Sequence, residues 1–353
     1  MLSRRVHFAF VFGTAAVMLV GCVAPSDQSS SLGSAQSSRS NAQSLLFSFL
    51  RRMERPPARA KRRATWIAPE AEVRNLLYVS DGGAREVVVY SYPDGELVGE
   101  LTNLDDPAGA CSDAQGNVWI VNSASFQIVE FAHGGKRAKA RLSDYGAANP
   151  LGCAVDPTTG NLAVTNVGTA SGGGGFSIYA GAKGSAENYQ DSDLMYAYFC
   201  GYDNEGNLFI DGLNGAYSFV LVELPSGSET PQTISLSGNV AFPGGVAWDG
   251  KYMAIGDQYY QGKRASAIFQ YSVAGSAGTL EGTTTLTDSC DALQFAISSR
   301  GMPRKDQQGK AVVVPDACLN SAAFYGYPAG GSPTETLSGL EYPVAAAVSR
   351  AHS

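Results

Sequence analysis

The chain has 353 residues, including 41 Gly, 17 Tyr and 15 Phe, and only 16% of its residues are charged. This composition argues against a coiled coil, a helical bundle or a disordered protein, and it favours short strands joined by turns. Only three histidines occur, His7, His133 and His352. Catalysis by histidine and His-rich metal sites are therefore nearly excluded.

The first 22 residues resemble a bacterial lipoprotein signal. Arg4 and Arg5 precede a short apolar stretch that ends directly before Cys22. The resemblance implies that residues 1–21 are a signal peptide and that Cys22 is the lipidation site. An ordinary secretory signal with a chance cysteine and a membrane helix are the alternatives, but the run is short for a membrane span.

The expected location is the cell envelope, with the acyl chain holding the protein to a membrane. Val23 follows Cys22 where an inner-membrane retention signal would have Asp. An outer-membrane anchor is therefore favoured if the source is Gram-negative.

Residues 22–69 are expected to form a lipid-anchored flexible tether. Residues 26–44 are rich in Ser and Gln, which cannot bury a core. An apolar stretch, 45–50, and seven basic side chains within residues 51–63 follow. This part either lies on an anionic membrane surface or is a solvated linker with a transient helix, and both alternatives stay open.

The charge of the remaining chain is opposite to that of the tether. After residue 69 there are 15 basic and 30 acidic side chains, a net charge of about −15. Binding to nucleic acid needs clustered Lys and Arg. A nucleic-acid partner is therefore not expected.

An internal repeat with a start-to-start spacing of 43 to 51 residues carries the fold signal. Its first half opens with Pro in most copies and closes six residues later with Asp or Ser. The clear copies are residues 107–113, 150–156, 243–249 and 343–349, and the degenerate copies are 197–203 and 292–298. This period is typical of a four-stranded propeller blade.

The second half of the repeat is a turn followed by an apolar strand that ends in Asp or Asn. Gly-Asn in several of the turns suits a tight hairpin. The copies are residues 116–122, 160–166, 206–211, 251–257 and 310–316, and residues 76–81 match the strand without a preceding partner. The C-terminal copy, 343–349, conversely has no second strand after it.

We therefore predict an all-β fold, a six-bladed β-propeller spanning residues 70–353. Its C-terminal strand would close the first blade and so remove the exposed sheet edges. A monomer is expected.

The repeat resembles the NHL-repeat and gluconolactonase-like six-bladed propellers over roughly residues 74–350. Because this fold hosts binding proteins, lactonases, lyases and signalling modules, the resemblance is specific for architecture and weak for activity. In the lactonase branch some metal ligands directly follow the Pro-type position, which here holds Ala108, Leu151, Gly244 and Val344. The lyase branch uses a catalytic His, and His133 falls in an expected outer hairpin.

A ring of side-chain oxygens is the first candidate site. The last residue of the second strand is Asp81, Asn122, Asn166, Asp211, Asp257 or Asp316 in the six copies. No cofactor is predicted, but such a ring could bind a divalent cation, Ca or Mg, in the central channel, or the hydroxyls of a sugar. The favoured alternative is that each residue caps nearby backbone N–H groups.

Aromatic residues on the same expected face form the second candidate site. Tyr196, Tyr259 and Tyr260 are the candidates for gripping a glycan or a peptide. For Tyr198 and Phe242, packing between blades is the favoured interpretation.

Five cysteines lie in the expected propeller. We predict a disulfide between Cys290 and Cys318, which face each other across a hairpin. Cys153 and Cys200 occupy equivalent positions and could pair if their blades approach closely. Cys111 is one position out of that register, and the pairing of these three residues stays open.

These features predict an envelope-anchored lipoprotein with a propeller that binds a protein or glycan partner. A metal-dependent enzyme related to the lactonases or lyases is the alternative, and a structural scaffold of the envelope is another. The sequence names neither a ligand nor a reaction.

Overall fold

The structure, a computed structural model, describes residues 41–46, 64–144, 147–169, 173–298 and 309–351. All of them belong to one compact unit, Ser38–Ser353. The expected signal peptide and Cys22 lie outside the described residues. In the described ranges, no helix is long and apolar enough to cross a membrane.

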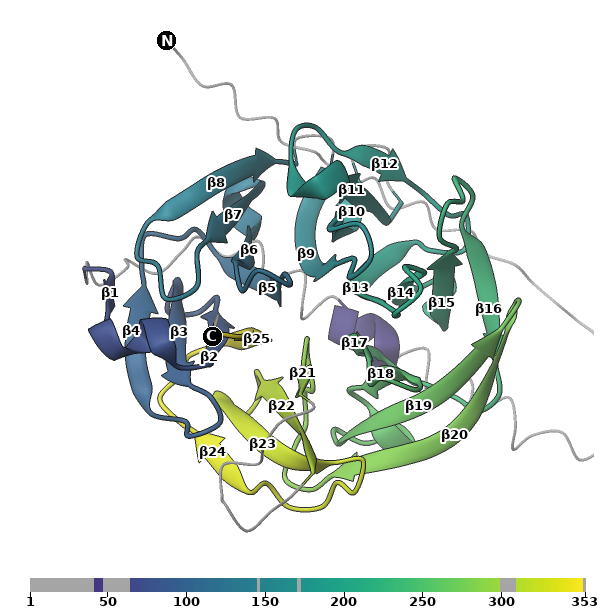
Figure 1. Cartoon of the computed structure of the whole chain (residues 1–353). Helices are drawn as coiled ribbons and strands as arrows, with labels where there is room; N and C mark the ends of the chain where they lie inside the picture. The colour runs from purple at the N-terminus through teal and green to yellow at the C-terminus, as the bar shows by residue number, and fades with distance from the viewer. Residues whose placement is uncertain (1–40, 47–63, 145–146, 170–172, 299–308, 352–353) are drawn as a thin grey trace, which may run out of the picture. The chain divides into compact units, whose positions relative to one another are not determined.

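Within this unit the sheets follow one another around a ring (Figure 1). The first sheet has the order β1-β4-β3-β2-β25. Its strands are β1 (Trp66–Ile67), β2 (Leu76–Asp81), β3 (Glu86–Ser91), β4 (Leu97–Leu101) and β25 (Pro343–Ser349), with the 3-10 helix η1 (Pro69–Val73) after β1. The first sheet thus starts before residue 70, where we expected the domain to begin.

The C-terminal strand closes the first sheet. β25 runs antiparallel to β2, with Leu76 opposite Ser349 and Asp81 opposite Pro343. This confirms the predicted closure, which joins the two ends of the propeller by backbone hydrogen bonds.

The next two sheets are four-stranded antiparallel meanders. One contains β5 (Pro107–Ser112), β6 (Val118–Asn122), η2 (Ser123–Ser125), β7 (Gln127–Phe131) and β8 (Ala138–Ser143). The other contains β9 (Ala147–Val155), β10 (Leu162–Thr169), β11 (Gly175–Tyr179), η3 (Ala180–Ala182) and β12 (Glu187–Tyr189).

An eight-stranded sheet comes next and consists of two such meanders. The first is β13 (Tyr196–Tyr202), β14 (Leu208–Leu213), β15 (Phe219–Leu224) and β16 (Gln232–Leu236). The second is β17 (Pro243–Trp248), β18 (Met253–Asp257), η4 (Tyr260–Gly262), β19 (Ser266–Ala274) and β20 (Ala277–Leu286). The outer strands β16 and β20 join them through a parallel pairing of only two residue pairs.

The last sheet has the order β21-β22-β23-β24. Its strands are β21 (Ala296–Ser298), β22 (Lys310–Asp316), β23 (Ser321–Tyr327) and β24 (Glu335–Leu337). The architecture is an all-β propeller, as the repeat predicted, and the described strands are hydrogen-bonded into five sheets, one of them double.

Glycines of the Pro-x-Gly motif allow the innermost strands to approach one another closely. A Cβ atom added to Gly152 would lie 3.0 Å from the Cα of Phe199, and one added to Gly245 would lie 2.7 Å from the carbonyl oxygen of Leu293. The first contact is tighter than nine in ten real Cβ contacts, and the second is one that real Cβ atoms essentially never make. The glycine of the motif is therefore needed because the innermost strands pack closely at the centre of the ring.

The hairpin between the first two strands of each repeat also has a local cause. Gly116, Gly160 and Gly206 adopt φ values of 75°, 73° and 85°, which glycine reaches without strain. The carboxylate of Asp113 accepts hydrogen bonds from the backbone N–H groups of Gln115 and Asn117, at 2.9 and 2.8 Å. Both features agree with the predicted turns.

The core lies between neighbouring sheets. The second strands β2, β6, β14 and β18 are buried along their whole length, so apolar side chains on both of their faces pack against adjacent sheets. Among the largest fully buried side chains are Tyr78, Tyr179, Tyr198, Tyr271 and Tyr325.

The imidazole of His133 forms hydrogen bonds between two sheets. This residue follows β7, and its Nδ1 lies 2.6 Å from Ser349 Oγ while its Nε2 lies 3.0 Å from the carbonyl oxygen of Arg74. The imidazole thereby connects the second sheet to β25 and to the segment between η1 and β2 of the first sheet.

Candidate binding site at the mouth of the propeller

We call the mouth face the face on which the first strands begin and the second strands end. In four sheets, the Pro of the repeat, at or near the start of the first strand, lies opposite the Asp or Asn at or near the end of the second. The pairs are Pro107 with Asn122, Pro150 with Asn166, Pro243 with Asp257 and Pro343 with Asp81. The candidate residues therefore share one face, as expected.

All six ring residues are buried, with exposed fractions from 0% to 4%. Asp257 accepts hydrogen bonds from the N–H groups of Ala241, Phe242 and Tyr259 at 3.0, 3.1 and 2.8 Å. Asp81 binds the N–H group of Tyr342 at 2.8 Å in the same way. These carboxylates hold the loop that leads into the first strand.

The other ring residues also bind groups of their own sheet or of the loop that enters it. Asp316 accepts from the N–H group of Cys290 at 2.8 Å, Asn122 from Asp105, and Asp211 from Phe199 at 2.8 Å. Asn166 donates to Ser177 Oγ at 3.2 Å. The geometry supports backbone capping over a ligand-binding ring, and a ligand role for these residues stays a prediction.

The ring carboxylates do not form a metal-ligand cluster in the part of the chain that the structure describes. The single group of three potential ligands found there is Cys290, Asp316 and Cys318. Its two sulfur atoms are joined in a disulfide. Because a metal ligand must be a free thiolate, this group is not a metal site.

Two ring residues each keep a side-chain oxygen without a hydrogen-bond partner among the described residues, Asp211 Oδ2 and Asn166 Oδ1. Of these two residues, Asp211 carries a carboxyl group, and its side chain is completely buried. Burial raises the pKa of the carboxyl well above its ordinary value, and the hydrogen bond from Phe199 offsets part of this shift.

A side chain that the sequence does not reveal connects inner strands of the ring. Gln294, two residues before β21, donates from Nε2 to the carbonyl oxygens of Ala110 and Cys153 at 2.9 and 2.8 Å. These acceptors belong to β5 and β9, on two other sheets. Only the folded ring brings these three residues together.

The candidate tyrosines are half-buried on the mouth face. Tyr196 stacks on Tyr217 with a centroid distance of 6.2 Å, and Tyr260 meets Phe269 edge to face at 5.8 Å. Tyr196, Tyr259 and Tyr260 all pack against one hydrophobic cluster.

Tyr198 and Phe242 pack between sheets, as predicted. Both are buried, and their rings meet edge to face at 5.5 Å. Tyr198 is in β13, and Phe242 directly precedes β17.

A short helix also lies at the mouth, where we expected only tether. Residues 41–46 are helical, and Ala42 and Leu46 are 5% and 0% exposed. Both belong to the hydrophobic cluster that contains the candidate tyrosines. In Figure 1 this helix, drawn in purple, lies inside the ring beside β17. The four-residue spacing of Ala42 and Leu46 is the sequence signal that could have revealed it.

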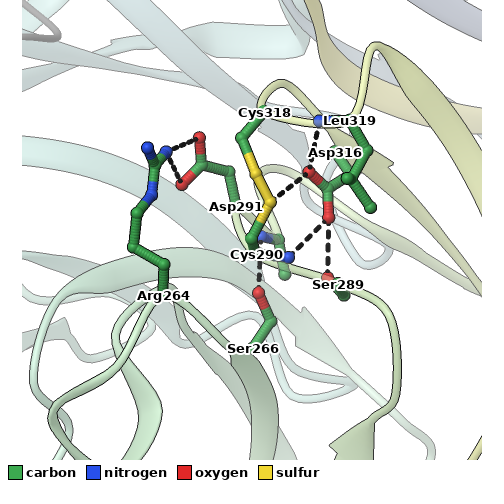
Figure 2. The surroundings of a disulfide bond; sticks show 9 residues. Arg264, Ser266, Ser289, Cys290, Asp291, Asp316, Cys318 and Leu319 are labelled. Atoms are coloured by element: carbon green, nitrogen blue, oxygen red, sulfur yellow. Dashed lines mark hydrogen bonds and ion pairs between the residues drawn. A yellow bond between two sulfur atoms is a disulfide. The ribbon is translucent and has the colours of Figure 1, made fainter.

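Two disulfides are present among the described cysteines. Cys290 and Cys318 are bonded, as predicted, with Cα atoms 6.2 Å apart. Figure 2 shows Asp316 beside this bond, and the bidentate ion pair between Arg264 and Asp291 next to it.

The second disulfide resolves the pairing that the sequence left open. Cys153 is bonded to Cys111, with Cα atoms 5.8 Å apart, and Cys200 is free and buried. The suggested pairing of Cys153 with Cys200 is therefore wrong. Two adjacent sheets pack with opposite faces toward each other, and successive residues of a strand point to opposite faces. Cys111 is one repeat position away from the equivalent Cys153 and Cys200, so its side chain points toward Cys153 on the next sheet.

A polar cleft of about 1260 Å³ lies on the opposite face. Its lining includes Asp113 and Asp156 from hairpin turns of the second and third sheets, Trp119 and Lys139 from β6 and β8, and Arg350 after β25. The sequence does not reveal this cleft, because only the fold brings these residues together.

The comparisons with known proteins are informative only for the fold. No protein-family model matches the sequence, and no curated protein is detectably similar to it. A chain in the crystal structure of the nidogen/laminin complex is similar with a TM-score of 0.60 and 14% identity, over 79% of this chain and 99% of that one.

Two further solved structures are similar. A functionally unknown protein from Desulfotomaculum acetoxidans has a TM-score of 0.54 and 10% identity, over 79% of this chain and all of that one. A chain of the Kuenenia stuttgartiensis hydrazine synthase has a TM-score of 0.50 and 12% identity, over 74% of this chain and 76% of that one. At these identities the similarity shows the fold alone, a β-propeller.

Proposed function

We propose that this chain is an envelope lipoprotein, anchored through Cys22, whose six-bladed propeller binds another protein at the mouth face. The eight-stranded sheet supports the count of six, because its two meanders share only two residue pairs. The sequence before Cys22 supports the anchor. The two disulfides fit an oxidising compartment outside the cytoplasm.

The observation that carries the proposal is the apolar mouth occupied by a peptide segment. Ala108, Leu151, Phe242 and Val344, from four different sheets or the loops before them, share one hydrophobic cluster with the helix 41–46. Half-buried tyrosines surround such a site with rigid, amphipathic contact area, which favours protein binding.

A peptide fits this mouth better than a glycan. A sugar site needs polar side chains that are free to hydrogen-bond with hydroxyl groups. The six Asp and Asn side chains of the mouth face are buried, and their known partners are groups of the protein itself. The apolar and aromatic contacts remain as the means of recognition.

At the positions where lactonase-like propellers have metal ligands, this chain has residues that cannot bind a metal through their side chains, so these positions do not support an enzyme. Ala108, Leu151 and Val344 are apolar and buried in the cluster. At Gly244 an added Cβ atom would lie 2.7 Å from a backbone carbon of Gly256. We therefore keep protein binding as the single proposed function.

The similar chain in the nidogen/laminin complex shows a related fold within a protein assembly. It supports the class of function proposed and gives no partner for this chain.

Site-specific photocrosslinking tests the proposal. A photoreactive p-benzoylphenylalanine at position 259, on the mouth face, should crosslink a discrete protein in intact cells that express the full-length chain. The same group at Lys183, exposed on the opposite face, is the control. Equal crosslinking from both positions would refute the proposal, and so would the absence of crosslinking from position 259 both in wild type and in a Leu46→Asp variant, in which the buried contact of the helix 41–46 is removed.

A separate experiment tests the anchor. Cys22→Ala should abolish incorporation of labelled fatty acid and release the protein from the membrane fraction. Continued labelling of the variant would rule out Cys22 as the lipidation site.

A further inference from the structure

The helix 41–46 contacts the propeller through one apolar face. Ala42 and Leu46 are four residues apart, so their side chains lie on the same side of the helix. They are 5% and 0% exposed, whereas Gln43 and Ser44 are exposed to solvent. The segment is therefore seated on the propeller by two side chains, with its polar face outward.

The surface under this helix is the mouth proposed above as the partner site. Ala42 and Leu46 lie in the same cluster as Ala108, Phe242 and Val344, residues at the openings of three sheets. Leu45 and the three candidate tyrosines, Tyr196, Tyr259 and Tyr260, are half-buried against that cluster, and so is Tyr342. A partner that contacts these tyrosines would meet the helix first.

The helix 41–46 is stable only because it packs against the mouth. A six-residue helix is too short to be stable alone in water, because nucleation costs more than so few hydrogen bonds return. Its contacts with the propeller consist mainly of two fully buried side chains and the half-buried Leu45. A segment held in this way belongs to the least stable part of a protein, and it opens without unfolding the sheets.

We propose that residues 41–46 are a cis-acting plug of the mouth. The mouth is a site for a short amphipathic helix that presents a small residue and a Leu four positions apart. The chain's own segment occupies it, and a partner with such a helix binds only after the plug has left. This proposal rests on the proposed function, because it assigns the resident occupant of the same site.

The attachment of the plug explains how it competes with a partner. A linked segment binds as an intramolecular ligand at a high effective concentration, so modest contacts keep the mouth closed. A free partner must then bury more apolar area on the mouth than Ala42 and Leu46 bury. This requirement excludes apolar peptides that bind weakly and without specificity.

Peptide binding in trans tests the plug. The probe is a fluorescein-labelled peptide of residues 38–46, and its anisotropy is measured with the full-length chain and its variants. Leu46→Asp places a charge in the buried position and should unseat the plug. Gln43→Asp adds the same charge at an exposed position of the same helix and is the matched control.

We expect the peptide to bind Leu46→Asp at least about tenfold more tightly than it binds wild type or Gln43→Asp, because only the first mouth is open. Equal binding to all three proteins, or no binding to Leu46→Asp, would overturn the proposal. Leu46→Ala is a milder variant that keeps the fold if the charged one does not, and it should show an intermediate gain.

Photocrosslinking from position 259 separates this proposal from the proposed function. A partner crosslinked more strongly in Leu46→Asp than in Gln43→Asp supports both. Equal crosslinking in the two variants refutes the plug and leaves the protein-binding function in place. Peptide binding to Leu46→Asp without any crosslinked partner refutes the proposed function and leaves the plug in place.

Discussion

The side-chain amide of Gln294 donates a hydrogen bond to the main-chain carbonyl of Cys153, 2.8 Å away on another sheet. The same nitrogen also donates to Ala110 on a third sheet. The main chain of Gln294 forms hydrogen bonds with Val344 and Ala346, both within β25. One residue thus connects four sheets at the centre of the ring, so its substitution should affect the whole propeller.

Gln294→Glu is expected to destabilise the protein in a pH-dependent way. The carboxylate would face two carbonyl oxygens in a buried position, which costs about 3 kcal/mol or more. Its pKa in the folded state would therefore lie above the unfolded value of about 4.3. The stability lost at neutral pH should return as the pH falls and the group becomes protonated.

Chemical denaturation near pH 4.5 and near pH 7.5 measures this effect. Gln261→Glu, at an exposed position of η4, is the matched control and should change the unfolding free energy by less than about 0.5 kcal/mol. A variant Gln294→Glu as stable as wild type at neutral pH would contradict the central role of this side chain.

Asp257→Ala tests whether the ring residues cap the backbone. The substitution leaves three N–H groups without their acceptor, so a loss of about 2 to 4 kcal/mol in unfolding free energy is expected. Asp257→Asn keeps one acceptor oxygen, as Asn122 and Asn166 do at equivalent positions, and should lose less. Thermal and denaturant unfolding give both values.

Retention of a bound partner distinguishes capping from ligand binding at Asp257. Capping alone predicts a lower melting temperature and unchanged partner crosslinking below that temperature. Lost crosslinking in a variant that remains fully folded would instead assign Asp257 to the binding site.

Removal of the Cys290–Cys318 disulfide should lower the unfolding free energy by about 3 kcal/mol, because the bond closes a long loop in the unfolded chain. The double variant Cys290→Ser, Cys318→Ser is compared with wild type by denaturant unfolding without reductant. Cys200→Ala, which removes a free thiol, is the control and should cost about 1 kcal/mol. A double variant that matches wild type would show that the bond adds no stability.

Native alkylation gives a further test of the cysteine assignment. Cys200 is buried, and burial raises the pKa of its thiol above the ordinary value. We therefore expect iodoacetamide to modify Cys200 only after unfolding, whereas Cys111 and Cys153 appear as a linked peptide in unreduced digests. Rapid modification of Cys200 in the folded protein would contradict this arrangement.

The repeat made the propeller predictable because the same local chemistry recurs along the chain. Pro at the start of a first strand and Asp or Asn at the end of a second strand are paired residues, as Pro107 and Asn122 show. The Cys290–Cys318 bond could be predicted for the same reason, since both residues flank one hairpin. Features inside a single repeat are therefore visible in the sequence.

Features that join different repeats were not predictable in the same way. The Cys111–Cys153 bond depends on which faces of two neighbouring sheets meet, and the role of Gln294 depends on distances across the ring. The helix 41–46 spans the end of the Ser- and Gln-rich stretch and the start of the apolar stretch, so Ala42 and Leu46 fall in two segments of different composition. These contacts arise only when the ring has closed.

Asp106, in the loop before β5, should make the stability of the propeller depend on pH. Burial raises the pKa of its carboxyl to about 6, the nearby Asp105 adds to this shift, and Arg85 opposes it. Because the folded pKa lies above the unfolded one, the protonated form favours folding. The contribution is complete below about pH 4 and is lost as the pH rises through about 6.

Asp106→Asn should remove this dependence and raise the unfolding free energy near pH 7.5 by up to about 2 kcal/mol, since the amide carries no charge to bury. Asn also tolerates the left-handed backbone of this position, where φ is 59°. Denaturant unfolding between about pH 4 and pH 8 measures both proteins. The more exposed Asp94→Asn is the control, and a wild-type profile without the predicted fall between about pH 4 and pH 7 would contradict the raised pKa of Asp106.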